Sequence, residues 1–247
     1  MKKGNTSAIF DIMKNNWPAV ALFIAPGLVH LNIHRINPDV RSRFGNFVLM
    51  CIWIILSFGI LAVRLLILTG FLRMAHLYGR REQKITKSLK AGAYFFRRLL
   101  LFIMMYVAAQ VVLGLVFMRL MNAQFVHSGL AKLVGLAHVI CAVILTFALM
   151  KLLLLVPALI IVRDCTILEG VKSVKEYKLF EQKWLVFLFV VYQLCSFLFG
   201  PLLPLKGYSG IFIRFYAGTI IKSLLLVIIG LSAVDFVGRL GIQADNE

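Results

Sequence analysis

The chain has 247 residues, of which 61% are hydrophobic and 15% charged, and its mean hydropathy is +0.92. A soluble domain of this length could not bury so large an apolar fraction, so the composition excludes that class and indicates an integral membrane protein. A backbone in lipid must satisfy its own hydrogen bonds, and the apolar runs lack a period of two. We therefore expect an all-α polytopic membrane helical bundle.

The net charge is +17, which in a soluble chain would favour nucleic acid as the partner. Here the basic residues alternate with apolar runs instead of forming one groove, so we expect membrane lipids with anionic headgroups as partners and no nucleic acid. The four cysteines are scattered singly, which predicts neither a disulfide framework nor a metal site. No cofactor is expected. The cysteines are Cys51, Cys141, Cys165 and Cys195.

Six apolar runs are long enough, or nearly so, to be membrane helices. A bilayer core needs about 20 apolar residues in a helix, and the first run barely reaches that length, so a re-entrant or interfacial placement stays open for it. We interpret it as a retained span rather than a removed signal peptide. The fourth run exceeds what a bilayer needs and should tilt, kink near Pro157 or project into the headgroups. After a basic leader over residues 1–16, the predicted spans cover residues 17–33, 47–72, 99–118, 133–162, 184–199 and 211–237.

The distribution of Lys and Arg among the loops predicts the orientation. With the N-terminus inside, the cytoplasmic segments hold seventeen of these residues and the opposite side holds seven. Positive charge is retained on the cytoplasmic side of a membrane. We therefore expect a multi-pass protein of the cell membrane with both termini in the cytoplasm.

An internal repeat is visible at an offset of 85 residues. Residues 86–102 align with residues 171–187 at six identical positions out of seventeen. The repeat predicts two hairpin units, residues 47–118 and 133–199, related by an axis along the membrane normal.

The segment that links the two spans of each hairpin has an amphipathic pattern. In the second unit, apolar side chains recur at helical spacing over residues 167–184, and charged side chains occupy the other side. We expect both linking segments to be helices that lie flat on the inner leaflet and form a basic interface there. The residues expected in this interface are Arg80, Arg81, Lys84, Lys87, Lys90, Lys172, Lys175, Lys178 and Trp184.

Three features taken together resemble a known group of membrane proteins. A basic turn over residues 79–82 follows an early span, Pro157 closes a later span with Asp164 just beyond it, and an amphipathic segment from Glu169 leads into Trp184. Residues 45–200 thereby resemble multi-spanning proteins related to the membrane domain of some glycerophosphodiester phosphodiesterases and to the YciC and DUF975 groups. The resemblance implies a six-span helical bundle of unassigned biochemistry. The phosphodiesterase itself is a separate domain, for which this chain has no room.

Three cations, Arg64, Lys151 and Lys222, fall inside predicted spans. Arg64 is close enough to the inner end of its span to extend to the headgroups, whereas the two lysines lie deeper. A cation near mid-bilayer costs about 3 kcal/mol or more unless it meets a partner or water, and Asp235 is too far along its span to pair with Lys222. All three are candidates for binding an anion such as a lipid phosphate. The alternative is that they face backbone carbonyls or an aqueous crevice and bind nothing.

The sequence offers no set of catalytic residues. His30 and His34 are four residues apart, but their neighbours favour an interfacial polar face over a metal site, and His138 favours a hydrogen-bonded core position. The chain has no nucleophile elbow, no His-Glu-x-x-His and no phosphate-binding glycine loop. With only ten acids, nearly all in loops, general acid and base pairs have no place, so we expect no enzyme.

Two functions fit these patterns. The first is a scaffold or accessory subunit at the cytoplasmic leaflet, which holds anionic lipid and a membrane or cytoplasmic protein partner. The alternative is a transporter or permease subunit for an anionic or lipid-like substrate, and an enzyme acting on lipid headgroups is a third. A scaffold predicts a bundle interior filled with apolar side chains. A transporter predicts a cavity at mid-depth lined by Lys151 and Lys222.

Overall fold

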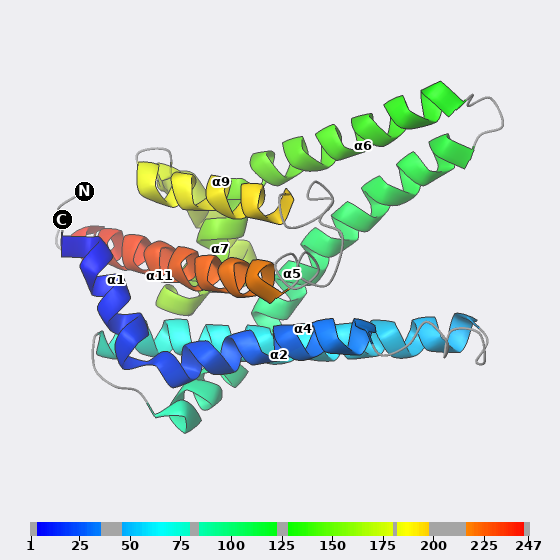
Figure 1. Cartoon of the computed structure of the whole chain (residues 1–247). Coiled ribbons are helices and arrows are strands. Elements are labelled where there is room, and N and C mark those ends of the chain that lie inside the picture. Colours follow the sequence, from blue (N-terminus) through cyan, green and yellow to red (C-terminus); the bar gives the residue numbers. More distant parts are fainter. Residues whose placement is uncertain are drawn as a thin grey trace.

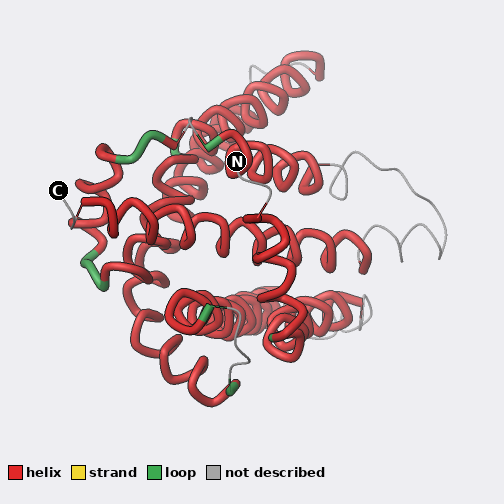
Figure 2. The backbone as a smooth tube through the Cα atoms, turned by 90° about the vertical axis from the view of Figure 1, so that its left-hand side faces the viewer, coloured by secondary structure: helices red, strands yellow, loops and turns green. Residues whose placement is uncertain are grey.

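The computed structural model describes residues 4–35, 46–79, 84–122, 128–179, 182–197 and 216–244, and within these ranges the backbone is helical and contains no strand (Figure 1, Figure 2). The predicted all-α class is confirmed. The helices are α1 (Gly4–Asn15), α2 (Trp17–Arg35), α4 (Asn46–Tyr78), α5 (Ile85–Asn122), α6 (Ser128–Ala148), α7 (Met150–Arg163), α8 (Ile167–Ser173), α9 (Lys183–Phe197) and α11 (Gly218–Ala244).

Three helices of the described chain are long and apolar enough to cross a membrane, and a fourth span results if the bent pair of α6 and α7 counts as one. The six spans expected are not confirmed. Among the residues whose side chains the structure describes, α2 and α9 contribute the shorter apolar stretches Trp17–Leu28 and Lys183–Ser196. The three long spans are Ile55–Tyr78, Ile85–Val116 and Gly218–Arg239.

The long fourth run is bent, but not where its proline suggested. α6 and α7 meet at Leu149 with a bend of 42°, whereas Pro157 lies inside α7. Pro157 has no N–H and cannot complete the usual helical bond to the carbonyl of Leu153, yet the helix changes direction a full two turns earlier. The bend directs α6 away from the centre of the bundle. Figure 1 shows α6 and the C-terminal half of α5 leaving the bundle together as an arm.

Polar side chains join the two helices of this arm. Tyr106 Oη and Thr146 Oγ1 are 3.1 Å apart, and Gln110 Nε2 donates to Tyr106 Oη, also at 3.1 Å. The outer faces of the arm are apolar, with Val112 and Ile144 60% and 61% exposed. Because lipid is as apolar as these side chains, hydrogen bonds and packing hold membrane helices together more than apolar burial does. The arm is therefore suited to surrounding lipid.

The most extensive contact in the described chain is between α4 and α5, which cross at two glycines. Gly70 and Gly92 face each other. A Cβ built on Gly70 would lie 1.8 Å from the carbonyl oxygen of Ser88, and one built on Gly92 would lie 2.1 Å from that of Leu66. Only glycine allows two backbones to approach this closely, as small residues do between membrane helices. The sequence has no glycine pair four apart, so the crossing became visible only when both helices were placed.

α7 is the central helix of the bundle. It packs against α4, α5, α6 and α11, and Leu155, Leu159 and Ile160 have no exposed surface. A helix covered by neighbours on most sides needs no polar face, which accounts for the apolar sequence of α7 between Lys151 and Arg163;.

The linking segments differ from the two surface helices expected. The first linking segment is not a separate helix. α5 begins at Ile85 and continues unbroken into its span, and no proline interrupts its backbone hydrogen bonds;. The second consists of the seven-residue α8 and a 3-10 turn over Val174–Glu176. Val174, Tyr177 and Leu179 on its apolar side are buried, so this side packs on the bundle rather than on lipid. The two aligned segments thus differ in backbone conformation, and the duplication stays a prediction.

Acidification should loosen the first turn of α8 selectively. The backbone N–H and the hydroxyl of Thr166 donate to Glu169 Oε2 at 2.7 and 2.8 Å, and these bonds lower the pKa of Glu169. A carboxylate whose pKa is lowered by folding contributes stability above its unfolded value of about 4.3, and this stability is lost as the pH falls through the folded value.

We expect hydrogen-exchange protection of residues 166–170 to fall from about pH 5 downward, while protection of α7 stays constant. The variant Glu169→Gln should show little protection at any pH, because the amide lacks the charge that strengthens these bonds. Equal pH profiles for the variant and the unaltered protein would contradict the assignment.

Candidate functional site

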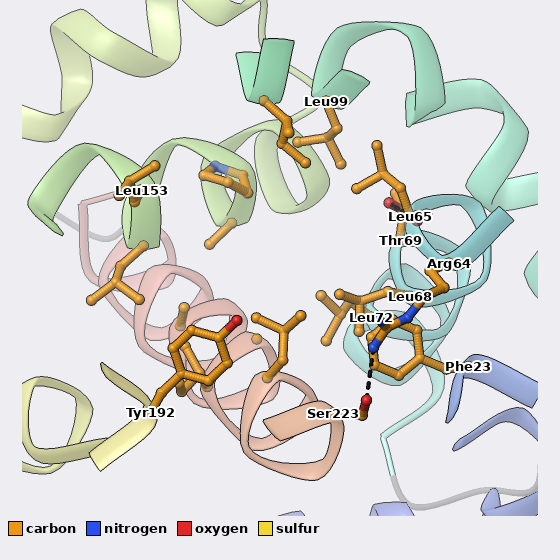
Figure 3. Close-up of a pocket in the computed structure, with 18 of the residues that line it drawn as sticks. Phe23, Arg64, Leu65, Leu68, Thr69, Leu72, Leu99, Leu153, Tyr192 and Ser223 are labelled. Carbon is orange, nitrogen blue, oxygen red and sulfur yellow. Dashed lines mark hydrogen bonds between the residues drawn. The ribbon is translucent and has the colours of Figure 1, made fainter. Parts of the chain in front are cut away.

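A cavity of about 660 Å³ lies among the helices. α4, α5, α7, α9 and α11 provide most of its wall, and Phe23 of α2 completes it. Sites between the helices of a bundle are common places for small-molecule ligands, and this volume is within their usual range. Figure 3 shows the cavity between Arg64 and Leu68 of α4 on one side and Tyr192 of α9 on the other.

Arg64 lies near the middle of α4, and its guanidinium lies inside the bundle. Its Nη2 donates a hydrogen bond to Ser223 Oγ of α11 at 2.7 Å, and its Cζ lies 4.7 Å from the centre of the Phe23 ring of α2 (Figure 3). Its Nε is buried and has no hydrogen-bond partner among the described residues. The expectation that Arg64 extends to the headgroups is therefore wrong. Contacts with α2 and α11 hold it in the cavity with a donor left over.

The first turns of α11 carry the second cation. Lys222 lines the cavity beside Ser223, with Thr219 one turn earlier. The structure describes α11 from Gly218 onward, and the depth of Lys222 in its predicted span stays a prediction. Gly27 of α2 lies close over this group, where a Cβ would come within 3.2 Å of Thr219 Cγ2 and 3.3 Å of Arg64 Nη1. A glycine at this position thus lets α2 cover the charged end of the cavity.

Arg64, Lys222 and the hydroxyl groups near them form a polar end of the cavity, and Thr69, Tyr106 and Gln193 add further polar side chains to its lining. The opposite end, toward the C-terminal ends of α4, α7 and α11, is formed by Leu72, Ile161 and Val234. In Figure 3 the hydroxyl of Tyr192 is directed into the space between the helices. The site is therefore polar at one end and hydrocarbon at the other. The main polar group consists of Arg64, Tyr192, Ser196, Thr219, Lys222 and Ser223.

Positive charge in the cavity is not balanced by acidic side chains. Arg64 and Lys222 both line it, and its described lining contains no aspartate or glutamate. Charged side chains inside a membrane bundle pair with each other, with backbone carbonyls or with water, and they mark ligand and ion sites. An anion bound at this end would meet two cations and no competing carboxylate.

Lys151 does not line this cavity. It is the second residue of α7, beside the bend at Leu149, and it is half-buried. The two lysines therefore do not share the site that was expected for a transporter. Arg64 takes the place that Lys151 was expected to hold.

The lysines of the expected basic interface are exposed on α5 and around α8. Arg80 and Arg81, like the side chains of His30, His34 and His138, lie outside the described residues. Trp184 is half-buried, packs against the buried core of the bundle and is stacked on the exposed Phe187, with ring centres 5.7 Å apart. The exposed lysines are Lys84, Lys87, Lys90, Lys172, Lys175 and Lys178.

Two arginines fix the C-terminal end of α7. Arg73 Nη1 of α4 donates to the carbonyl oxygens of Ile161 and Val162 at 2.5 and 3.1 Å, and Arg98 Nη1 of α5 donates to Asp164 Oδ1 at 2.5 Å. Cations at a helix C-terminus stabilise its unpaired carbonyl groups. Since Ile161 forms the apolar end of the cavity, the two arginines also position that wall.

Sequence reasoning missed the hydroxyl groups of the site. Thr219 and Ser223 stand one turn apart on α11, and Tyr192 and Ser196 have the same spacing on α9. Polar residues one turn apart in an apolar run indicate a helix face that is turned toward the interior of a membrane bundle. This spacing next to Lys222 was the signal in the sequence that could have located the site.

Comparison of the chain with models of known protein families, with curated proteins and with solved structures finds no match. The resemblance to the glycerophosphodiester phosphodiesterase membrane domain and its relatives stays a prediction. Any functional inference rests on the cavity and its charges.

Proposed function

We propose that this is a non-catalytic, multi-pass protein of the cell membrane that binds an anionic amphiphile in the cavity between its helices. The observation that carries the proposal is the position of Arg64, inside the bundle with an unpartnered Nε donor and with Lys222 in the same cavity. Each cation held away from water costs about 3 kcal/mol or more without a counter-charge. A bound carboxylate or phosphate would supply that charge.

The apolar end of the cavity supports an amphiphile rather than a small inorganic anion. Leu72, Ile161 and Val234 there have nothing to offer a hydrated ion, whereas a hydrocarbon chain would fill this end by ordinary packing. Lipids and their breakdown products are the abundant membrane molecules that combine an anion with a chain. The ligand would therefore reach the site from the bilayer.

A non-catalytic role is supported by the groups available. The described lining of the cavity has no carboxylate or histidine, the side chains that most often serve in acid and base catalysis. Burial raises the pKa of the Cys165 thiol beyond the end of α7, which keeps it protonated and a poor nucleophile.

The exposed lysines support an accessory role at one leaflet. With both termini in the cytoplasm, the lysines of α5 and α8 would face anionic headgroups of the inner leaflet, where each adds about 1 kcal/mol of attraction near the surface. The protein would then hold its ligand in the bundle while this end contacts the membrane surface and a protein partner.

A transporter of the same amphiphile is the second candidate, favoured by cations that lie inside the bundle instead of at its surface. The two functions differ in whether the ligand crosses. Vesicles containing the protein should accelerate transbilayer movement of a fluorescent alkyl phosphate if it is a transporter. A rate equal to that of protein-free vesicles would exclude transport and leave binding.

Replacing the two lysines separately tests the binding site. We expect the purified protein in neutral detergent to bind radiolabelled hexadecanoate in preference to hexadecanol, and Lys222→Met to weaken this binding about tenfold, the equivalent of one charge-assisted hydrogen bond. Lys151→Met, a matched change outside the cavity, should leave binding unaltered. Equal affinity for acid and alcohol, or equal losses in both variants, would overturn the proposal.

A further inference from the structure

We infer that the ligand has a single acyl chain, with its anionic group at Arg64 and Lys222 and its chain extending toward Leu72 and Val234, and that Ala233 limits the length of that chain. This inference rests on the proposed function and specifies its ligand. It follows from the volume, the length and the end wall of the cavity.

The volume sets the size of the ligand. The cavity has a volume of about 660 Å³, within the range of about 300–1,000 Å³ of sites that enclose a small molecule. A ligand with one hydrocarbon chain falls within this range. A diacyl phospholipid is more than twice as large and would leave one chain outside.

The length of the cavity agrees with its volume. Lys222 and Val234 both line it and are twelve positions apart on α11, which at about 1.5 Å per residue separates them by about 18 Å along the helix axis. Between them the cavity is bounded by Leu226, Ile229 and Gly230 of α11. An extended chain therefore has room along the axis, and the wall beside it is hydrocarbon.

Closely packed residues form the far end of the cavity. Leu72 of α4 packs onto Gly230 of α11, where a Cβ would lie 2.9 Å from Leu72 Cδ1. Ala233 is next to Val234 in the wall and is 3% exposed. A larger side chain at Ala233 would occupy the space of the last carbons of the ligand and leave the charged end unchanged.

The charged end suits one small anionic group. Arg64 has already used Nη2 for Ser223, and its Nε still lacks a partner among the described residues. The planar guanidinium group matches the geometry of both carboxylate and phosphate oxygens, so a fatty acid and an alkyl phosphate would both fit. Their relative affinities distinguish a carboxylate ligand from a phosphate ligand.

A chain-length series tests the inference on the purified protein in neutral detergent. Unlabelled carboxylates and alkyl phosphates of 8 to 18 carbons, dioleoyl phosphatidylglycerol and hexadecanol would compete with radiolabelled hexadecanoate at equal mole fraction. A ligand in a micelle already has its chain out of water, so its transfer into the protein gains little from apolar burial. The affinity therefore depends on how well the chain fills the cavity, and we expect it to peak at about sixteen carbons. Whichever headgroup series binds more tightly identifies the source.

The variant Ala233→Leu should move the peak to chains about two to three carbons shorter, since it adds three carbons to the wall. The exposed Ala109→Leu of α5 is the matched control and should leave the peak in place. If Ala233→Leu does not fold, the series on the unaltered protein still decides. Equal affinities at all lengths, or tighter binding of phosphatidylglycerol, would overturn the single-chain inference and leave the proposed function intact. Failure of every anionic probe would instead overturn the proposed function.

Discussion

Gly70→Ala and Gly92→Ala should each lower the melting temperature of the purified protein substantially, whereas Gly59→Ala and Gly114→Ala on the same helices should not. A Cβ on Gly70 or Gly92 would lie 1.8 or 2.1 Å from a backbone oxygen of the facing helix, and none of the described atoms comes within 4 Å of a Cβ on Gly59 or Gly114. A side chain can turn aside from a clash, but these carbonyls cannot, so α4 and α5 must separate. We expect a loss of about 3 kcal/mol or more, the upper end of the range for overpacking.

For a protein of this size, that loss corresponds to a fall of about 6–12 °C in melting temperature. The control variants Gly59→Ala and Gly114→Ala should instead raise the melting temperature slightly, because alanine favours a helix over glycine by about 0.5–1 kcal/mol. Tryptophan fluorescence during heating in detergent would measure all four proteins. Melting temperatures that do not separate the two pairs would show that α4 and α5 do not cross at Gly70 and Gly92.

Arg64→Met should weaken binding of hexadecanoate by about ten- to one-hundredfold, the equivalent of the 1.5–3 kcal/mol of hydrogen bonds to a charged group. The same change should make the ligand-free protein more stable. Replacing a cation that has no acidic partner by an apolar side chain of similar volume removes its desolvation cost, about 3 kcal/mol for a cation inside a membrane bundle. The opposite signs of these two effects distinguish a ligand-binding arginine from a structural one.

Arg119→Met, at an exposed position near the C-terminal end of α5, is the control for the loss of one positive charge. It should alter neither binding nor stability by a measurable amount, since it is outside the cavity;. Binding would be followed with radiolabelled hexadecanoate and stability by the melting temperature without ligand. A lower melting temperature for ligand-free Arg64→Met would assign Arg64 a structural role through its bond to Ser223.

The sequence was sufficient for the helical class because apolar runs in lipid leave the backbone few alternatives. It was less reliable for where a helix begins, ends or bends, because these depend on packing against other helices. The first linking segment looked like a surface helix since lysines alternate with apolar residues there, yet α5 continues straight through it. Pro157 suggested the bend in the long fourth run, but α7 continues through the proline and the chain bends by 42° at Leu149.

The sequence could predict which types of residue belong to the site, but not which of them lie together in one cavity. Arg64 and Lys222 were selected as cations in apolar runs, which is a local property. That they share one cavity, and that Lys151 is apart from it, depends on the angles at which α4, α7 and α11 pack. Distances along a helix could not decide whether Arg64 reached the headgroups, because its hydrogen-bond partner Ser223 is 159 residues away.

The glycine crossing of α4 and α5 also determines how a lipid can enter the site. These two helices touch through their backbones, so no ligand can pass between them at Gly70 and Gly92 without breaking the closest packing in the described chain. α9, on the other side of the cavity, packs mainly against α11 among the described residues. The side of the cavity between α4 and α5 is thus closed by backbone contact.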